Sequence, residues 1–121
     1  MEYPKVRIDT WDYKDGHYCS GGKKWSCARM IKLAEDKPVI DIPLCALPRW
    51  YWPWEDKMTI DIFIEHMNRV KNADLDKPIL IAPHGGIIDG MHRICKAVLD
   101  GQTTIKAVVF DTMPSPDGVD D

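Results

Sequence analysis

Residues 38–111 alternate between short runs rich in β-branched residues and longer segments in which apolar residues recur at helical spacing. Apolar residues three and four positions apart lie on one face of a helix, whereas short β-branched runs favour strands. The pattern predicts an α/β (α+β) fold, a small mixed sheet with flanking helices. The expected strands are 39–42, 79–82, 87–88 and 104–110, and the expected helices are 60–71 and 91–100.

The 60–71 helix follows Thr59, whose hydroxyl is expected to cap it. Its apolar positions form one stripe, which is expected to be buried. The stripe consists of Ile60, Phe63, Ile64, Met67 and Val70. His66 lies near this stripe, and we assign it no functional role.

The two ends of the chain differ from the middle. Residues 5–11 alternate apolar and polar side chains and predict a strand, and helical spacing over 25–36 predicts a helix. Residues 1–37 are therefore interpreted as an added N-terminal strand and helix, and 38–112 as the main domain. Prolines and acidic residues dominate 113–121, which predicts a disordered tail.

Composition narrows the classes of protein. The chain has 121 residues and a net charge of −3, so it has room for one domain and no overall charge that attracts DNA. No apolar run reaches the ~18 residues of a membrane span, and no signal-peptide pattern is seen at the start. The four cysteines are scattered, which favours free thiols in the cytoplasm. His17, Cys19 and Cys27 lack a fourth ligand at metal-binding spacing, so no metal site is expected.

The segment Asp89-Gly90-Met91-His92-Arg93 carries the strongest functional signal, because it opens a predicted helix. A glycine at that point lets a ligand approach the backbone, and the first N–H groups of a helix attract anions. Arg93 can donate two hydrogen bonds to a phosphate, and His92 can donate to the same anion or exchange a proton. The plain structural alternative is a turn glycine, a solvated arginine and a capping histidine.

The order of elements over 38–111 resembles the ParB N-terminal domain and sulfiredoxin superfamily. The resemblance is strongest at Lys77-Pro78-Ile79-Leu80-Ile81 and at Ile87–Arg93. The motif Asp89-Gly90-x-His92-Arg93 is similar to that of the free serine kinases within this superfamily. Sulfiredoxins place their catalytic cysteine where this chain has Met91, so sulfiredoxin activity is not expected.

The resemblance implies a nucleotide site and assigns its residues. Gly90, Met91, His92 and Arg93 are expected to hold phosphate, with Asp89 and His92 in catalytic roles. Glu55 lies near the place where the serine kinases have a catalytic carboxylate, and helix-terminal charge is its alternative role. The implied cofactor is Mg²⁺ with ATP, ADP or CTP.

The loop Arg49–Glu55 is unusually aromatic and contains Trp50, Trp52 and Trp54. Its prolines exclude a central strand. Three interpretations remain open: a lid on the chain's own core, an interface for a protein partner, or a platform that stacks a nucleobase.

These observations favour a nucleotide-phosphate-binding domain, either an NTPase or a small-molecule phosphotransferase. One alternative is a non-catalytic module that binds protein or DNA, for example a mobile-element protein acting on a host complex. Another is a ParB-like nuclease, although the acidic net charge disfavours DNA binding.

Overall fold

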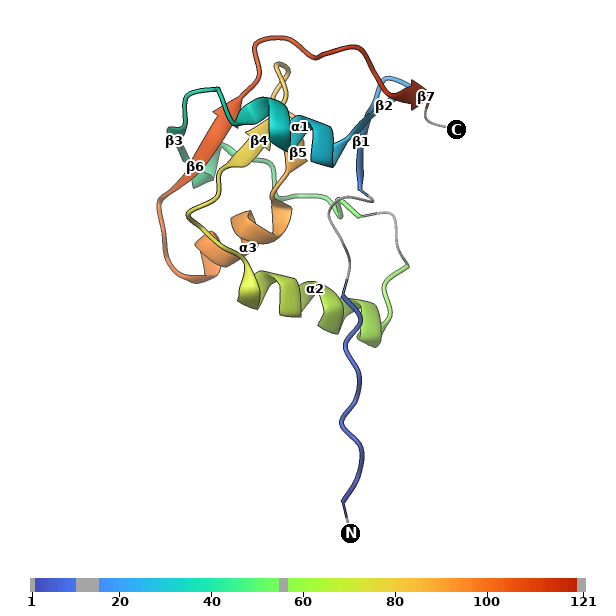
Figure 1. Cartoon of the computed structure of the whole chain (residues 1–121). Coiled ribbons are helices and arrows are strands. Elements are labelled where there is room, and N and C mark those ends of the chain that lie inside the picture. Colours follow the sequence, from blue (N-terminus) through green and yellow to red (C-terminus); the bar gives the residue numbers. More distant parts are fainter. Residues whose placement is uncertain (1, 11–15, 55–56, 120–121) are drawn as a thin grey trace.

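A computed structural model describes residues 2–10, 16–54 and 57–119 (Figure 1). Within these residues the chain forms two small sheets and three α-helices, which confirms the predicted α+β class. The strands are β1 (His17–Ser20), β2 (Lys23–Ser26), β3 (Ile40–Pro43), β4 (Ile79–Ile81), β5 (Ile87–Asp89), β6 (Thr104–Val109) and β7 (Gly118–Val119). The helices are α1 (Cys27–Ala34), α2 (Ile60–Asn72) and α3 (Met91–Leu99), with a 3-10 turn at Leu44–Ala46.

The larger sheet has the strand order β3-β6-β4-β5. Strands β4 and β6 run parallel, while β3 pairs with β6 and β5 pairs with β4 in the antiparallel direction. The predicted mixed sheet is therefore present. Strand β5 is connected directly to α3 through Gly90, so the predicted phosphate segment lies where an edge strand ends and a helix begins.

Each face of this sheet has its own core, because successive side chains of a strand point to opposite faces. Leu80 and Val108 lie on the face covered by α1 and strand β2, where Trp25 and Met30 are buried. Ile79 and Ile105 lie on the other face, which α3 covers. Figure 1 shows α1 and α3 on opposite sides of the sheet, with α2 beyond α3.

Helix α2 begins as predicted, because the Thr59 hydroxyl accepts a hydrogen bond from the Ile62 N–H at 3.1 Å. It packs on α3, and Lys96 of α3 donates to the carbonyls of Lys71 and Ala73 at its C-terminal end. The predicted burial of its apolar stripe is wrong except at Val70. The other four stripe positions, Ile60, Phe63, Ile64 and Met67, are exposed, and the buried residues of the helix are His66 and Val70.

The N-terminal region differs from its prediction. Residues 5–10 are exposed and form no strand, and Trp11 lies outside the described residues. Instead, β1 and β2 form an antiparallel hairpin closed by Gly21 and Gly22, which have φ of 60° and 77°. A two-residue Gly-Gly turn is a strong hairpin signal, because positive φ at both positions matches the twist of the strands. The helix predicted over 25–36 is present as α1.

The predicted disordered tail, 113–121, differs in the structure over residues 113–119, and residues 120–121 lie outside the described residues. Residues 118–119 pair with β2, the Pro114 carbonyl accepts a hydrogen bond from the Trp25 indole at 2.8 Å, and Asp117 accepts one from the Ser26 N–H at 2.7 Å. Arg29 adds an ion pair to Asp117 at 3.1 Å. Polar and backbone contacts hold this segment, which is why a composition poor in apolar residues did not indicate it.

Candidate functional site

The segment 89–93 lies at the junction of β5 and α3. Gly90 precedes the helix with φ of 111°, and the Ile94 N–H donates to its carbonyl at 3.0 Å. The prediction that Gly90 lies at a helix N-terminus is confirmed. No side chain caps this end from position 90, since glycine has none. The first turn of α3 is therefore a place where backbone N–H groups carry partial positive charge.

Gly90 has a packing role besides the ligand approach that the sequence predicts. A Cβ built at Gly90 would lie 2.8 Å from the Cβ of Ile79 and closer still to its Cγ2, and 3.1 Å from Nη1 of Arg93. Ile79 is completely buried. The space left by the missing side chain is thus filled by the chain itself, and the positive φ independently requires glycine.

Arg93 makes two contacts within the chain. Nη1 donates to the Pro78 carbonyl at 2.8 Å, and Nη2 donates to Asp89 at 3.3 Å, in an ion pair one helical turn apart. Its side chain is 18% exposed, which is far from the solvated arginine of the plain alternative. These bonds tie α3 to the start of β4. Two of the five N–H donors of the guanidinium are used in them.

His92 and Trp54 lie against each other, although the sequence assigned them to separate motifs. The Trp54 indole stacks on the His92 imidazole with centroids 4.6 Å apart and an angle of 16° between the rings. It also stacks on His66 of α2, at 4.0 Å and 25°. The two histidine rings are joined by a hydrogen bond of 2.8 Å between His66 Nδ1 and His92 Nε2.

The geometry of these three rings places both imidazoles under one indole. The His66 and His92 centroids are 5.1 Å apart, which is too close for the indole to lie between them. One face of Trp54 therefore covers the hydrogen-bonded histidine pair. Trp52 closes the side of the cluster, with its ring edge-on to Trp54 at 4.7 Å and to His66 at 5.4 Å. We call Trp52, Trp54, His66 and His92 the ring cluster.

Trp50, Met91 and Glu55 are the other residues that the sequence predicts for the site. Trp50 is 86% exposed and contacts Tyr51 rather than the ring cluster. Met91 packs partly against the core of the α3 face. Glu55 lies outside the described residues.

His66 is the site residue that the sequence analysis missed. Its side chain is 2% exposed, and a buried polar group needs a hydrogen-bonding partner. Its burial could have been predicted from its position, because His66 lies four residues before Val70 and therefore on the same face of the helix.

A second polar cluster joins the hairpin to the β4–β5 turn. His84 Nε2 lies 3.1 Å from the Tyr18 hydroxyl and 3.3 Å from the Ser20 hydroxyl. The Gly86 N–H donates to His84 Nδ1 at 3.4 Å. These contacts tie the β1–β2 hairpin to the turn between β4 and β5.

The cysteines and acidic residues assemble no metal site among the described residues. All four cysteines are free thiols. Burial, together with the nearby Asp89 carboxylate, raises the pKa of the Cys27 thiol to about 11, and its Sγ lies 3.8 Å from the Ile88 carbonyl. No helix within the described part of the chain is long and apolar enough to cross a membrane.

Comparison of the chain with protein-family models, with curated proteins and with solved structures gives no match. The resemblance to the ParB and sulfiredoxin superfamily therefore stays a prediction that depends on the segment 77–93 and on the order of elements.

Proposed function

We propose that this chain binds the phosphate groups of a nucleotide at the first turn of α3, as a member of the ParB and sulfiredoxin superfamily. The observation that carries the proposal is the stacking of Trp54 on His92 at 4.6 Å. Two segments that the sequence marks separately, the aromatic loop and the glycine-led helix start, meet at one point. Such a meeting of aromatic and anion-binding groups suits a nucleotide better than it suits inorganic phosphate alone.

The groups around this turn are suited to an anion. Helix N-termini attract negative charge, and α3 has no acidic residue in its first turn. Arg93 keeps donors beyond the two that bind Pro78 and Asp89, and those two bonds hold its guanidinium in place before a ligand arrives. The stack on Trp54 and the hydrogen bond to His66 fix the ring of His92 in the same way.

The proposal extends from nucleotide binding to catalysis. Mg²⁺ is commonly held by one or two carboxylates together with the phosphates of a nucleotide, and Asp89 is the carboxylate beside this turn. With the metal bound, the developing charge on a transferred phosphoryl group would be neutralised. His92 is the candidate to move a proton. A phosphotransferase or NTPase fits these groups better than a nuclease, since the net charge of −3 does not favour a DNA backbone.

The test is calorimetry with ATP, ADP, CTP, GTP and inorganic phosphate, with and without Mg²⁺, on a matched pair of variants. Met91→Glu and Met91→Gln remove the same thioether from the first position of α3 and differ only in charge. A carboxylate about 6 Å from a phosphate charge, at an effective dielectric constant of about 20, costs roughly 2–3 kcal/mol. We expect the Glu variant to bind at least about tenfold more weakly than the Gln variant.

Three outcomes of the calorimetry test the proposed phosphate site and its catalytic role. Equal affinities of the two Met91 variants, or no binding by the wild type, would contradict a phosphate site at this turn. Binding accompanied by product formation supports phosphoryl transfer or NTP hydrolysis. Binding without product formation supports a non-catalytic nucleotide-binding module.

A further inference from the structure

Helix α2 exposes the apolar stripe that the sequence predicts to be buried. Ile60 is 76% exposed, and Phe63, Ile64 and Met67 are 44%, 37% and 40% exposed. These positions are three and four residues apart and lie on one side of the helix. A helix face of this kind is normally covered by another element. Within the described residues, a large part of this face stays exposed.

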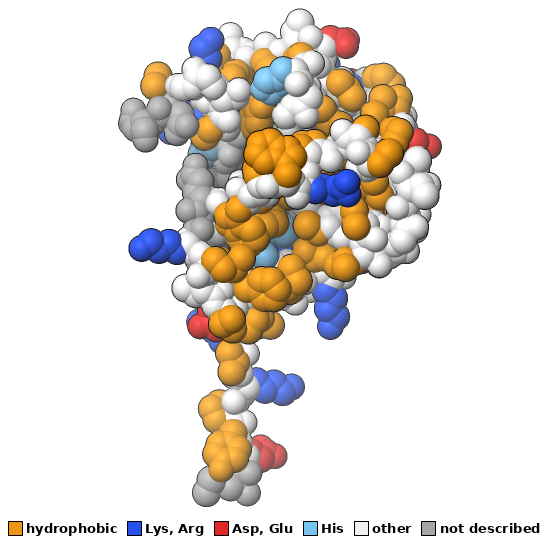
Figure 2. Space-filling model, turned by 180° about the vertical axis from the view of Figure 1, so that it is seen from behind, with side chains coloured by type: hydrophobic (Ala, Val, Ile, Leu, Met, Phe, Trp, Pro, Cys, Tyr) orange, Lys and Arg blue, Asp and Glu red, His pale blue; other side chains and the backbone are white. Residues whose placement is uncertain are grey.

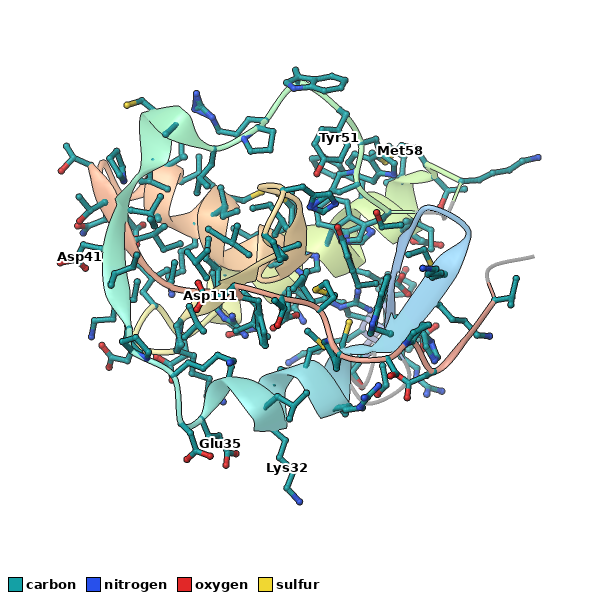
Figure 3. The ribbon with its side chains drawn as sticks, turned by 90° about the horizontal axis from the view of Figure 1, so that it is seen from above. Lys32, Glu35, Asp41, Tyr51, Met58 and Asp111 are labelled. Atoms are coloured by element: carbon teal, nitrogen blue, oxygen red, sulfur yellow. The ribbon has the colours of Figure 1, made fainter. Side chains whose placement is uncertain are left out.

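The aromatic loop extends this exposed face. Trp50, Tyr51, Trp52 and Met58 are 86%, 41%, 43% and 52% exposed, and Trp52 contacts α2 through His66. Figure 2 shows hydrophobic side chains gathered in the middle and lower part of this side of the molecule. Figure 3 places Tyr51 and Met58 on the side opposite Lys32 of α1 and Glu35, the residue that follows this helix. We call these eight residues the α2 face: Trp50, Tyr51, Trp52, Met58, Ile60, Phe63, Ile64 and Met67.

The size of the α2 face matches a protein interface. Large side chains have ~150–250 Å² of surface, so eight that are roughly half exposed present on the order of 800 Å². The largest apolar patch of a typical monomer is ~300–600 Å². A standard protein interface buries ~800 Å² on each partner. The α2 face is therefore large enough for one partner of a stable complex.

The N-terminal arm, residues 2–10, is a second exposed apolar element of the same chain. Tyr3 and Val6 are 83% and 79% exposed. Arg7 and Asp9 form an ion pair at 3.3 Å, which puts these alternate residues on one edge of the extended arm. Val6 and Ile8 then share the other edge. In Figures 1 and 2 the N-terminal part of the arm extends away from the folded body on the side of α2. Ile8, which is nearer the body, is 41% exposed.

We propose that the chain forms a twofold-symmetric dimer in which the N-terminal arm of each copy lies along the α2 face of the other. The contact between an arm and an α2 face occurs twice in such a dimer, because the twofold axis relates the two copies. Together the two contacts cover both exposed apolar elements of each chain. The lengths agree. Nine extended residues span about 30 Å at ~3.3 Å each, and the thirteen residues of α2 span about 20 Å at 1.5 Å each. The apolar edge of the arm contacts the stripe, and its charged edge stays in water.

Sedimentation equilibrium on the full chain tests this proposal with three single variants. Val6→Asp alters the arm, and Ile60→Asp alters the α2 face at the first position of the helix, where a carboxylate suits the dipole. Leu99→Asp, at the end of α3, is the control, because Leu99 is 74% exposed and Ile60 is 76% exposed. We expect the wild type to be a dimer, the first two variants to dimerise ~30-fold or more weakly, and the control to match the wild type.

A mixture of the Val6→Asp and Ile60→Asp variants separates arm exchange from other dimers. A mixed dimer keeps one intact contact, between the normal arm of one chain and the normal face of the other. It should therefore form more readily than either variant dimer. A monomeric wild type, an unaffected Val6→Asp variant, or equal weakening by Leu99→Asp would overturn the proposal.

Discussion

Replacing Gly90 by alanine tests whether this glycine is required for packing at the turn from β5 into α3. Two costs add at this position. A residue with a side chain in the left-handed region is disfavoured by ~1–2 kcal/mol, and φ is 111° here. The new Cβ would lie 2.8 Å from the Cβ of the completely buried Ile79, and overpacking of this kind costs ~1–3 kcal/mol. We expect a total loss of about 2–5 kcal/mol in the free energy of unfolding.

Gly101→Ala is the matched control, because it shares only one of the two costs. Gly101 follows α3 with φ of 75°, and a Cβ built there meets nothing within 4 Å. Only the backbone strain applies, so the expected loss is ~1–2 kcal/mol. The smaller entropy of the unfolded chain affects both variants alike. The φ of 111° at Gly90 lies farther from the left-handed region open to alanine than the 75° of Gly101, so the difference between the two variants is an upper limit on the clash with Ile79.

Urea unfolding, followed by far-ultraviolet circular dichroism, gives both free energies with the same probe. If the slopes with urea agree, the difference in midpoints reports stability alone. Thermal melts should show the same order, with a shift of roughly 4 °C for each kcal/mol. If Gly90→Ala costs no more than Gly101→Ala, the packing of Gly90 on Ile79 is refuted, and the positive φ alone would explain the glycine.

Three further outcomes are expected. The Ser26 N–H and the Arg29 guanidinium hold the pKa of the Asp117 carboxyl below its ordinary value, so its contribution to stability is present above pH ~4 and lost as the pH falls through the lowered pKa. Acidification should therefore release the C-terminal segment before the core unfolds, which changes the fluorescence of Trp25. The Asp117→Asn variant should show this fluorescence change already at neutral pH. Cys45 is exposed, whereas the Cys27 thiol has a pKa of about 11, so iodoacetamide at pH 8 should modify Cys45 first and Cys27 only on unfolding, as peptide mass mapping will show. Arg93→Lys should lower the free energy of unfolding by ~1–3 kcal/mol in the same urea assay, because lysine cannot reproduce the two hydrogen bonds to the Pro78 carbonyl and Asp89. An unchanged stability would contradict the role of these bonds.

The sequence by itself determined the elements of residues 38–111 and the position of the candidate site. The apolar runs at 79–82 and 104–110 predicted strands of a mixed sheet, and Gly90 was correctly placed before a helix. These predictions succeeded because they depend on local properties. Side-chain alternation, helical spacing and the conformational freedom of glycine act over a few neighbouring residues.

Only the tertiary structure decided what each face contacts. The spacing of Ile60, Phe63 and Met67 correctly gave a helix with an apolar side, but burial depends on which other element reaches that side, and α3 reaches the side of His66 and Val70 instead. In the same way, the hydrogen bond of Arg93 to the Pro78 carbonyl, the stacking of Trp54 over two histidines and the docking of the tail on Trp25 join residues 12 to 89 positions apart. No local pattern encodes such contacts, because each requires two segments that only the folded chain brings together.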